Sequence, residues 1–346
     1  MIRVGVDAWN LPHDRRGIGR YVRALLDAFA RDFADRITCT LVIPEWPVFL
    51  ARRSYREAAG APRLPVISRR AVDGAGLDLL WFPFNGVSWN RFSLPAIATL
   101  HDALPFVMPG YDDAARAPFV AAARRCISIV SDSEHAAGEL ARVLPFPRER
   151  IEAIPLGVTP PGPPGPVPPR IAALDPFVLF VGEAEERKGL PMLAEAVERV
   201  RAGGVKCRLV AVGRIPPETV LPPHTTVLGH IDDATLAALY RTCSAFAYPS
   251  RYEGFGLPVL EAMSYGAPVV ASSATAVPEA GGDAARYVPP DDVEGWAEAL
   301  AAVLLEPGVA AELHARGLAR AASMTWRACA ERTLAAMEAA TAKAGR

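Results

Sequence analysis

Short apolar runs alternate with segments of helical periodicity along most of this chain, and that alternation is the strongest constraint on its fold. In the first half, the runs are short enough to be buried strands, and the segments between them carry apolar residues at helical spacing. The expected strands are Ile2–Asp7, Ile37–Ile43, Leu77–Phe82, Ala96–Leu100 and Ile127–Ser131, and the expected helices are 18–33, 113–125 and 134–144. Strands joined by helices in this way form a parallel sheet covered on both faces. The pattern predicts a doubly wound α/β domain.

A proline-rich stretch interrupts the alternation near the middle of the chain. Seven of the ten residues from Pro160 to Pro169 are proline, and the stretch also contains two glycines. Proline lacks the N–H group that a helix interior or a central strand requires, so the stretch favours a stiff, extended spacer. A proline-rich ligand for another protein is the alternative interpretation.

The alternation resumes after this stretch and predicts a second domain of the same class. Its expected elements are strands at 177–181, 207–212, 245–248 and 269–271, helices at 189–202, 232–242 and 257–265, and closing helices at 293–305, 309–322 and 325–342. We expect two Rossmann-like domains over 1–158 and 176–324, a linker over 159–175 and a final helix over 325–346. Open sheets of this type bind ligands at the carboxyl ends of their strands, which predicts a cleft where those ends face each other.

Composition excludes several classes of function. The 346 residues carry 37 Lys and Arg against 38 Asp and Glu, so a general nucleic-acid binder is not expected. The five cysteines are widely spaced without a Cys-x-x-Cys pair, which fits small buried side chains better than disulfides or a zinc site. The N-terminus lacks the apolar core of a signal peptide, and no apolar run reaches the ~18 residues of a membrane span. We expect a cytoplasmic protein, at most one that contacts the inner face of the membrane.

One segment of the first domain is rich in arginine. It contains Arg52, Arg53, Arg56, Arg63, Arg69 and Arg70, and the pair Arg124 and Arg125 adds to the basic character of the domain. Aromatic and aliphatic residues between these cations permit a membrane-surface or anionic-acceptor patch. A solvated arginine-rich helix is the alternative, and the sequence favours neither.

The most informative motif runs from Tyr248 to Met263. Two carboxylates, Glu253 and Glu261, flank a loop with glycines at 254 and 256 that leads into a helix opened by Pro258. The N–H groups of Phe255, Gly256 and Leu257 belong to the start of that helix, which is suited to an anion. A carboxylate presents two acceptor oxygens, which suit a vicinal diol such as that of a ribose. The alternative makes Glu261 a solvated helix residue and Glu253 a cap.

This spacing of two glutamates resembles the signature of the retaining glycosyltransferases of family 4, which have the GT-B fold. Other segments resemble that family in the same order along nearly the whole chain. They are Gly17-Ile-Gly19, Thr99-Leu-His101-Asp102, Val130-Ser-Asp-Ser133, Ile154-Pro-Leu-Gly157, Gly182 through Arg187-Lys188-Gly189, and Ala267-Pro-Val-Val-Ala-Ser272 through Glu279. Each segment is weak evidence by itself, but the combination is specific.

The resemblance implies a hexosyltransferase that moves mannose from GDP-mannose to a saccharide or lipid-linked acceptor, with retention. The N-terminal domain would bind the acceptor and the C-terminal domain the nucleotide sugar, and the final helix would cross back to the N-terminal domain. The implied catalytic residues are His101 beside the anomeric carbon, Glu253 at the sugar hydroxyls, and Arg187 with Lys188 at the diphosphate. The implied donor-binding residues are Gly17, Gly19, Gly182, Ile231, Phe255, Gly256, Leu257 and Glu261.

The resemblance also implies chemistry without a metal or a further cofactor. Arg187, Lys188 and helix N–H groups would neutralise the leaving diphosphate, and no paired-aspartate ligand motif is present. No side chain is an evident general base, and the family's proposed mechanism uses the leaving phosphate itself. Many members carry arginine directly after the glycine at 182, whereas this chain has Glu183, which we expect to point away from the phosphates.

Four alternatives remain to be compared with this interpretation. The first is a transferase that uses a UDP-sugar, and the second is a sugar-nucleotide 2-epimerase with the same fold, which would need further acid and base groups. An NAD-dependent dehydrogenase is disfavoured because the motif at Gly17 lacks a third glycine and an acidic residue after the second strand. A non-catalytic sugar-binding module would not need Arg187 and Lys188.

Overall fold

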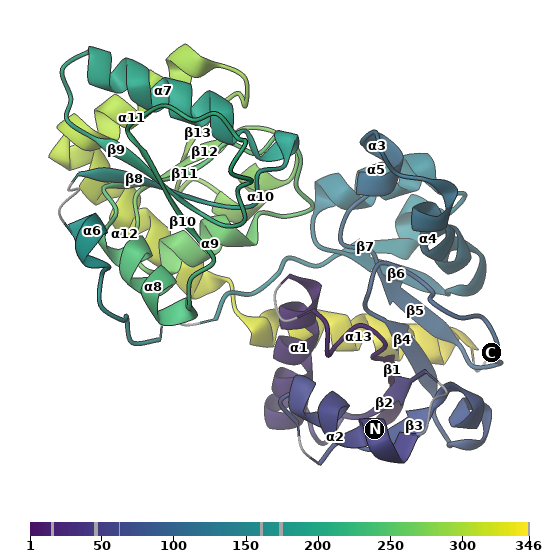
Figure 1. Ribbon diagram of the computed structural model, residues 1–346. Coiled ribbons are helices and arrows are strands. Elements are labelled where there is room, and N and C mark those ends of the chain that lie inside the picture. Colours follow the sequence, from purple (N-terminus) through teal and green to yellow (C-terminus); the bar gives the residue numbers. More distant parts are fainter. Residues whose placement is uncertain (15–16, 45–47, 62, 160–161, 173–175, 345–346) are drawn as a thin grey trace. The chain divides into compact units, whose positions relative to one another are not determined.

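The computed structural model describes residues 1–346 except 15–16, 45–47, 62, 160–161, 173–175 and 345–346. It divides the chain into two compact units, which are described separately. Unit 1 consists of residues 1–157 together with 325–346, and unit 2 consists of residues 158–324. Figure 1 shows that each unit is a sheet flanked by helices.

The sheet of unit 1 has seven parallel strands in the order β3-β2-β1-β4-β5-β6-β7. Their bounds are β1 Ile2–Asp7, β2 Ile37–Ile43, β3 Val66–Ser68, β4 Leu79–Phe82, β5 Ala96–Thr99, β6 Ser128–Ser131 and β7 Ile151–Ala153. The order reverses between β1 and β4, as in other doubly wound sheets. The polar residues at the carboxyl ends of these strands are therefore carried to one edge.

Helices flank the sheet of unit 1. They are α1 Ile18–Asp32, α2 Val48–Ala58, α3 Leu104–Val107, α4 Asp113–Arg125, α5 Glu134–Val143 and α13 Trp326–Ala344. Helix α1 buries Tyr21, Leu25 and Phe29, as its spacing predicts. Helix α13 packs along α1, and the ring of Trp326 lies 6.3 Å from that of Tyr21. The final helix thus completes the core of unit 1.

The sheet of unit 2 has six parallel strands in the order β10-β9-β8-β11-β12-β13. Their bounds are β8 Phe177–Val181, β9 Arg208–Val212, β10 Thr225–Gly229, β11 Ala245–Tyr248, β12 Val269–Ser272 and β13 Arg286–Val288. The helices are α6 Pro169–Ala172, α7 Leu190–Ala202, α8 Asp233–Thr242, α9 Leu257–Ser264, α10 Val277–Gly281, α11 Val293–Leu305 and α12 Pro307–Ser323. Helices α7 and α11 cover one face together, with the indole of Trp296 fully buried.

Two Rossmann-like domains with parallel sheets confirm the predicted fold class. Part of the expected linker over 159–175 packs onto unit 2. The N–H of Gly165 donates to the carbonyl oxygen of Ala234 at 2.9 Å, and Ile171 is fully buried. Residues 160–161 and 173–175 of the expected linker lie outside the described residues. All five cysteines are free and buried, as expected.

Candidate functional site

Two segments of unit 2 meet at the carboxylate of Glu253. The 3₁₀ turn Glu186–Lys188 follows β8, and Glu253 follows β11, the neighbouring strand. The Glu253 Oε1 atom accepts hydrogen bonds from Lys188 Nζ at 2.5 Å and from Arg187 Nη1 at 3.2 Å. We call Arg187, Lys188 and Glu253 the ion cluster. It unites three predicted catalytic residues from two separate motifs.

Backbone contacts hold the two segments of the ion cluster together. The N–H of Arg251 donates to the carbonyl oxygen of Arg187 at 2.7 Å, and the Arg251 guanidinium donates to the Glu186 carbonyl at 2.6 Å. Gly189 ends the turn at a φ of 69°, and a Cβ there would lie 2.8 Å from the carbonyl oxygen of Pro249. Only glycine fits this position without strain. The turn is therefore fixed against the segment that carries Glu253.

The charges of the ion cluster are partly enclosed. The side chains of Arg187, Lys188 and Glu253 are 18%, 13% and 14% exposed. Burial acts to raise the pKa of Glu253, but Lys188 and Arg187 outweigh it, and the pKa is lowered below its ordinary value. Arg187 Nε also donates to Glu185 at 2.6 Å, and Lys188 Nζ lies 3.3 Å from the Tyr248 hydroxyl. The cluster holds ionised groups of both signs at neutral pH.

Helix α9 begins beside Glu253 and contains the second glutamate of the motif. Gly256 caps the helix at a φ of 114°, and Phe255 before it is buried. The first N–H groups of a helix have no partner within the helix, so this end favours an anion. Glu261 lies one turn from Leu257 and thus on the same helix face, partly buried. The structure places Phe255, Gly256, Leu257 and Glu261 on one short helix and its cap.

The ends of β8, β9 and β10 approach one another closely through glycines. The N–H of Gly182 donates to the Val212 carbonyl, and the N–H of Gly213 to the Gly229 carbonyl, at 2.9 and 3.0 Å. A Cβ on Gly213 would lie 2.0 Å from the carbonyl oxygen of Gly182. Ile231 follows two residues after Gly229 and is partly buried. Gly182 and Ile231, both predicted donor-binding residues, thus lie at the same edge of the sheet.

Glu183, the departure from the family pattern, pairs with a cation outside the ion cluster. Its Oε2 atom accepts from Arg214 Nη2 at 3.0 Å, and the two side chains are 52% and 81% exposed. An ion pair this exposed contributes little to stability. The carboxylate is thus directed to Arg214.

In unit 1, the glycine loop closes onto the first turn of α1. Gly17 caps α1 with a φ of 58°, and the N–H of Gly19 donates to Asp14 Oδ2 at 3.0 Å. A Cβ on Gly19 would lie 1.8 Å from the carbonyl oxygen of Asp14, so no other residue fits there. Residues 15–16 of this loop lie outside the described residues. The need for glycine here is steric, whatever ligand the loop contacts.

His101 follows β5 and is bound on both sides of its ring. Its Nδ1 atom lies 2.8 Å from Asp132 Oδ2, and its Nε2 atom lies 3.0 Å from the Pro83 carbonyl oxygen. Its backbone N–H donates to Asn85 Oδ1 at 2.8 Å. The ring is 10% exposed. Both ring nitrogens are thus occupied by protein groups. None of the three partners of His101 was predicted from the sequence.

A second polar cluster at the carboxyl edge of unit 1 also escaped the sequence analysis. Asp7, the last residue of β1, accepts from Ser88 at 2.5 Å and from Arg69 and Trp89 at 3.2 Å each. Burial raises the pKa of Asp7 despite these donors. Arg69, expected in a basic surface patch, therefore turns inward and is 19% exposed. A charged residue at the carboxyl end of a buried apolar strand, the last residue at Asp7 and the next one at Asp132, was the signal available in the sequence.

The rest of the arginine-rich segment includes an exposed helix. Helix α2 has no buried residue among those described, and Phe49 and Leu50 on it are 73% and 68% exposed. Arg53 pairs with Glu57 one turn later at 2.7 Å. The helix thus combines exposed apolar and cationic side chains.

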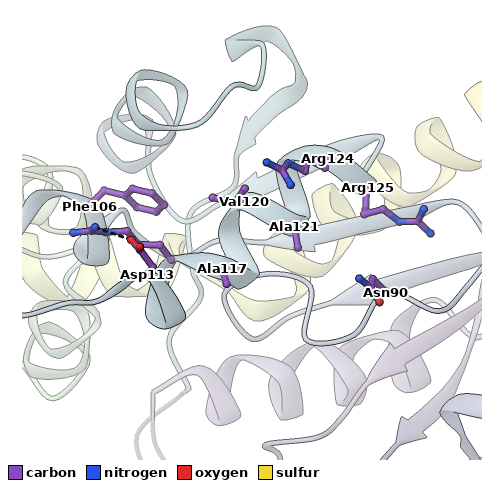
Figure 2. A pocket seen from close by; sticks show the side chains of 9 residues that line it. Asn90, Phe106, Asp113, Ala117, Val120, Ala121, Arg124 and Arg125 are labelled. Carbon is purple, nitrogen blue, oxygen red and sulfur yellow. Dashed lines mark hydrogen bonds and ion pairs between the residues drawn. The ribbon is translucent and has the colours of Figure 1, made fainter.

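A separate surface pocket of about 430 Å³ lies on α4 of unit 1. Figure 2 shows the apolar side chains of Val120 and Ala121 between Phe106 and Arg125. Its lining is Asn90, Phe106, Asp113, Arg116, Ala117, Val120, Ala121, Arg124 and Arg125. Arg125 is already bonded to the Phe92 carbonyl at 2.7 Å, and Arg116 to that of Pro105 at 2.9 Å. The pocket contains none of the predicted catalytic or donor-binding residues.

No three His, Cys, Asp or Glu side chains in the described segments gather closely enough to hold a metal ion. None of the helices described above is both long and apolar enough to cross a membrane.

Comparison with known proteins identifies the family. Residues 15–160 match the model for "Glycosyltransferase Family 4", and residues 175–306 match "Glycosyl transferases group 1". The chain is 29% identical over 262 residues to O-antigen chain mannosyltransferase B of Escherichia coli. The matched region covers 69% of each protein. It is 30% identical over 236 residues to an MMP alpha-(1->4)-mannosyltransferase of Mycolicibacterium hassiacum, covering 64% of this chain and 56% of that protein.

Among solved structures, HepE of Anabaena in complex with UDP and glucose has the same fold. The TM-score is 0.70 at 15% identity, over 98% of this chain and the whole of that one. The two family matches lie one in each half of the chain and together span most of it. The chain is therefore a glycosyltransferase of family 4 with the GT-B fold.

Proposed function

We propose that this glycosyltransferase transfers mannose from GDP-mannose to a saccharide or lipid-linked acceptor, with retention at the anomeric carbon and without a metal. The observation that carries the proposal is the ion cluster, in which Arg187 and Lys188 converge on the single carboxylate of Glu253. Two cations in a partly enclosed site are suited to a diphosphate, whose charge grows as it leaves. The names of the relatives in Escherichia coli and Mycolicibacterium hassiacum support mannose.

On binding, the diphosphate would replace Glu253 as the partner of Arg187 and Lys188. The released carboxylate would then accept hydrogen bonds from the hydroxyls of the transferred sugar. Glu261 on α9 would accept from the ribose diol, since its carboxylate offers two acceptor oxygens. The remaining donor contacts would come from the N–H groups of Phe255, Gly256 and Leu257, and from the backbone at Gly182 and Ile231.

The transfer step needs no protein base in this proposal. The bond between the anomeric carbon and the diphosphate oxygen breaks, and the acceptor hydroxyl bonds to the same face of that carbon. The hydroxyl proton passes to the departing phosphate oxygen. Gly17 and Gly19 would bring backbone close to donor and acceptor. The backbone carbonyl of His101, at the end of β5, would stabilise positive charge on the anomeric carbon.

Thermal-shift measurement with a panel of nucleotide sugars tests the donor. A ligand that binds the folded state raises the Tm by mass action, and we expect GDP-mannose to give the largest shift. A larger shift with a UDP-sugar would favour the alternative donor, and HepE of Anabaena has been solved in complex with UDP-glucose. An epimerised sugar formed without acceptor would instead indicate the 2-epimerase.

Product analysis tests the reaction. NMR of the glycoside should show the α configuration of the donor, and turnover should survive excess EDTA because protein cations meet the leaving charge. An inverted product, or activity lost in EDTA and restored by Mg²⁺ or Mn²⁺, would contradict the proposal.

We also propose that α2 lets unit 1 contact an anionic membrane surface. Phe49 and Leu50 are exposed next to Arg52 and Arg53, a combination typical of interfacial helices. Co-sedimentation with vesicles containing phosphatidylglycerol should fall in F49S/L50S and should not occur with neutral vesicles. Equal sedimentation of the variant would leave α2 a solvated helix.

A further inference from the structure

The positions of the protons in the pair formed by His101 and Asp132 follow from its geometry. The imidazole Nε2 atom lies 3.0 Å from a carbonyl oxygen, that of Pro83, which only accepts hydrogen bonds. Nε2 must therefore carry a proton. The Nδ1 atom lies 2.8 Å from Asp132 Oδ2, so a second proton lies between the ring and the carboxyl group.

The second proton belongs to the imidazole because the imidazole is the stronger base. Ordinary pKa values are about 6.5 for histidine and about 3.9 for aspartate. Burial is the largest single effect and disfavours the charged ring, but Asp132, the Pro83 carbonyl and Asp102 together outweigh it, and the pKa of His101 is raised above its ordinary value. Burial raises the pKa of Asp132 as well, opposed by the charge of His101. The ionised pair is the arrangement in which each charge has its partner.

The groups around the pair do not compete for this proton at neutral pH. The ring of Tyr21 on α1 contacts His101 edge-on at 5.0 Å, and burial raises the pKa of Tyr21 well above its ordinary value. Burial likewise raises the pKa of Cys329 on α13 to about 12. Asp102, the next residue along the chain, adds a negative charge that favours the imidazolium.

The loop after β4 holds the other side of the histidine. Besides the Pro83 carbonyl, Asn85 accepts from the backbone N–H of His101 and adopts a φ of 53°. This left-handed conformation is uncommon for a residue other than glycine, and asparagine tolerates it best. The ring and the backbone of His101 are thus fixed from two elements, β6 with Asp132 and the loop with Pro83 and Asn85.

We propose that Asp132 is a positioning residue that keeps the His101 ring an imidazolium throughout the neutral pH range. His101 then serves the reaction as a fixed cation that favours the negative charge of the departing phosphate. It is not a proton acceptor, because neither nitrogen has a lone pair to offer. The part that concerns the reaction rests on the proposed transferase function. The protonation state of the ring does not.

Nitrogen NMR on the full chain labelled with ¹⁵N-histidine tests the protonation state directly. The chain has six histidines, and glutamine variants at His13, His135, His224, His230 and His314 assign the remaining signals to His101. At about pH 7.5, where a free imidazole is mostly neutral, we expect both His101 nitrogens to have protonated shifts. One unprotonated nitrogen in the unmodified chain at this pH would overturn the proposal, with no variant of Asp132 needed.

The Asp132→Asn variant tests whether Asp132 is the cause. An asparagine amide can donate to Nδ1, so we expect a neutral ring with a single protonated nitrogen at about pH 7.5. Asp112→Asn is the matched control, because Asp112 caps α4 by accepting from the Ala115 N–H, a bond that asparagine retains. A ring that stays doubly protonated in Asp132→Asn would remove Asp132 from this role.

The pH profile of kcat/KM tests the role in the reaction. If His101 were a general base, the unmodified enzyme would gain activity as the ring deprotonates. General base catalysis would raise the reaction rate by about 10²–10⁴-fold. We expect no such limb in the unmodified enzyme or in Asp112→Asn. In Asp132→Asn, kcat/KM should fall as the pH rises through the pKa of the released ring. An unchanged profile shape with a lower Tm would show a structural role only and would contradict the fixed-cation role. Absence of turnover with every donor would count against the proposed function, whereas the NMR result would stand.

Discussion

The pair of His101 and Asp132 in unit 1 and the ion cluster in unit 2 are both salt bridges, but they differ in what they leave available. The Asp132 side chain is 6% exposed and faces one cation on a ring whose other side is also bonded. The Glu253 side chain is 14% exposed and is shared by two cations, one of them on a flexible lysine stem. The first arrangement fixes a geometry, whereas the second can exchange its carboxylate for another anion. Stability should therefore depend most on the pair, and turnover most on the cluster.

Removing the cation of the buried pair should give the largest effect. His101→Gln leaves the Asp132 carboxylate buried without its partner, and we expect the free energy of unfolding to fall by about 3–5 kcal/mol. Denaturant unfolding measures this change. His230→Gln, at an exposed position, should stay within about 0.5 kcal/mol. Equal losses of unfolding free energy in the two variants would show that the pair of His101 and Asp132 contributes no more to stability than an exposed histidine.

Removing a cation of the ion cluster should act on rate. Lys188→Ala should lower turnover by about 10²–10³-fold, as loss of a preorganised charge stabiliser does, because charge on the diphosphate grows in the transition state. Arg187→Ala should cost a similar amount or less. Steady-state kinetics measures both.

Glu183→Ala is the matched control for Lys188→Ala, because it removes an exposed ion pair on the same turn. It should change turnover little. If Glu183→Ala abolished activity while Lys188→Ala left it intact, the phosphate site would not lie on this turn.

Replacing Glu261 should have a smaller effect, on nucleotide affinity, and this variant tests whether unit 2 binds the ribose. If its carboxylate holds the ribose diol, Glu261→Ala should weaken nucleotide binding by about 1.5–3 kcal/mol, the usual contribution of a hydrogen bond to a charged group. Calorimetry with free GDP and UDP measures it. An unchanged affinity would remove Glu261 from the ribose.

The contributions of the two salt bridges to the free energy of unfolding should be lost at opposite ends of the pH range. Each unit of pKa shift corresponds to about 1.4 kcal/mol. The lowered pKa of Glu253 means that its contribution is present above about pH 4.5 and is lost as the pH falls through the folded value. The raised pKa of His101 means that its contribution is complete below about pH 6.5 and is lost as the pH rises through the folded value. Unfolding free energies against pH should show Glu253→Gln flattening the acid side and His101→Gln the alkaline side. The reverse assignment would refute both.

The sequence predicts the central strands of both sheets well and misses their edges. Four strands lack a prediction, and they are β3, β7, β10 and β13, the edge strands of the two sheets. Edge strands here are short and partly exposed, so their residues do not form the continuous apolar run that marks a buried parallel strand. Only the pairing with a neighbouring strand defines them.

Some features of the candidate site likewise follow from local sequence patterns, whereas others depend on contacts between residues far apart in the chain. The motif around Glu253 and the turn at Lys188 are local patterns, but their meeting at one carboxylate depends on β8 and β11 being neighbours. The partners of His101 come from residues 16, 18 and 31 positions away in the chain. No periodicity or spacing in the sequence encodes those contacts. Polar residues at strand ends were the one signal that pointed to them.

The point where the chain enters and leaves unit 2 has a consequence for how the protein can be taken apart. The N–H of Val158 donates to the carbonyl oxygen of Met324 at 2.9 Å, so the two ends of unit 2 meet. On the other side of the junction, a Cβ on Gly157 would lie 2.2 Å from the backbone nitrogen of Trp326. Unit 2 is thus a cassette inserted into unit 1 at a single position. A few residues joining Gly157 to Thr325 would close unit 1 without it, and adjacent ends also make unit 2 a candidate for circular permutation or for exchange with the cassette of a relative.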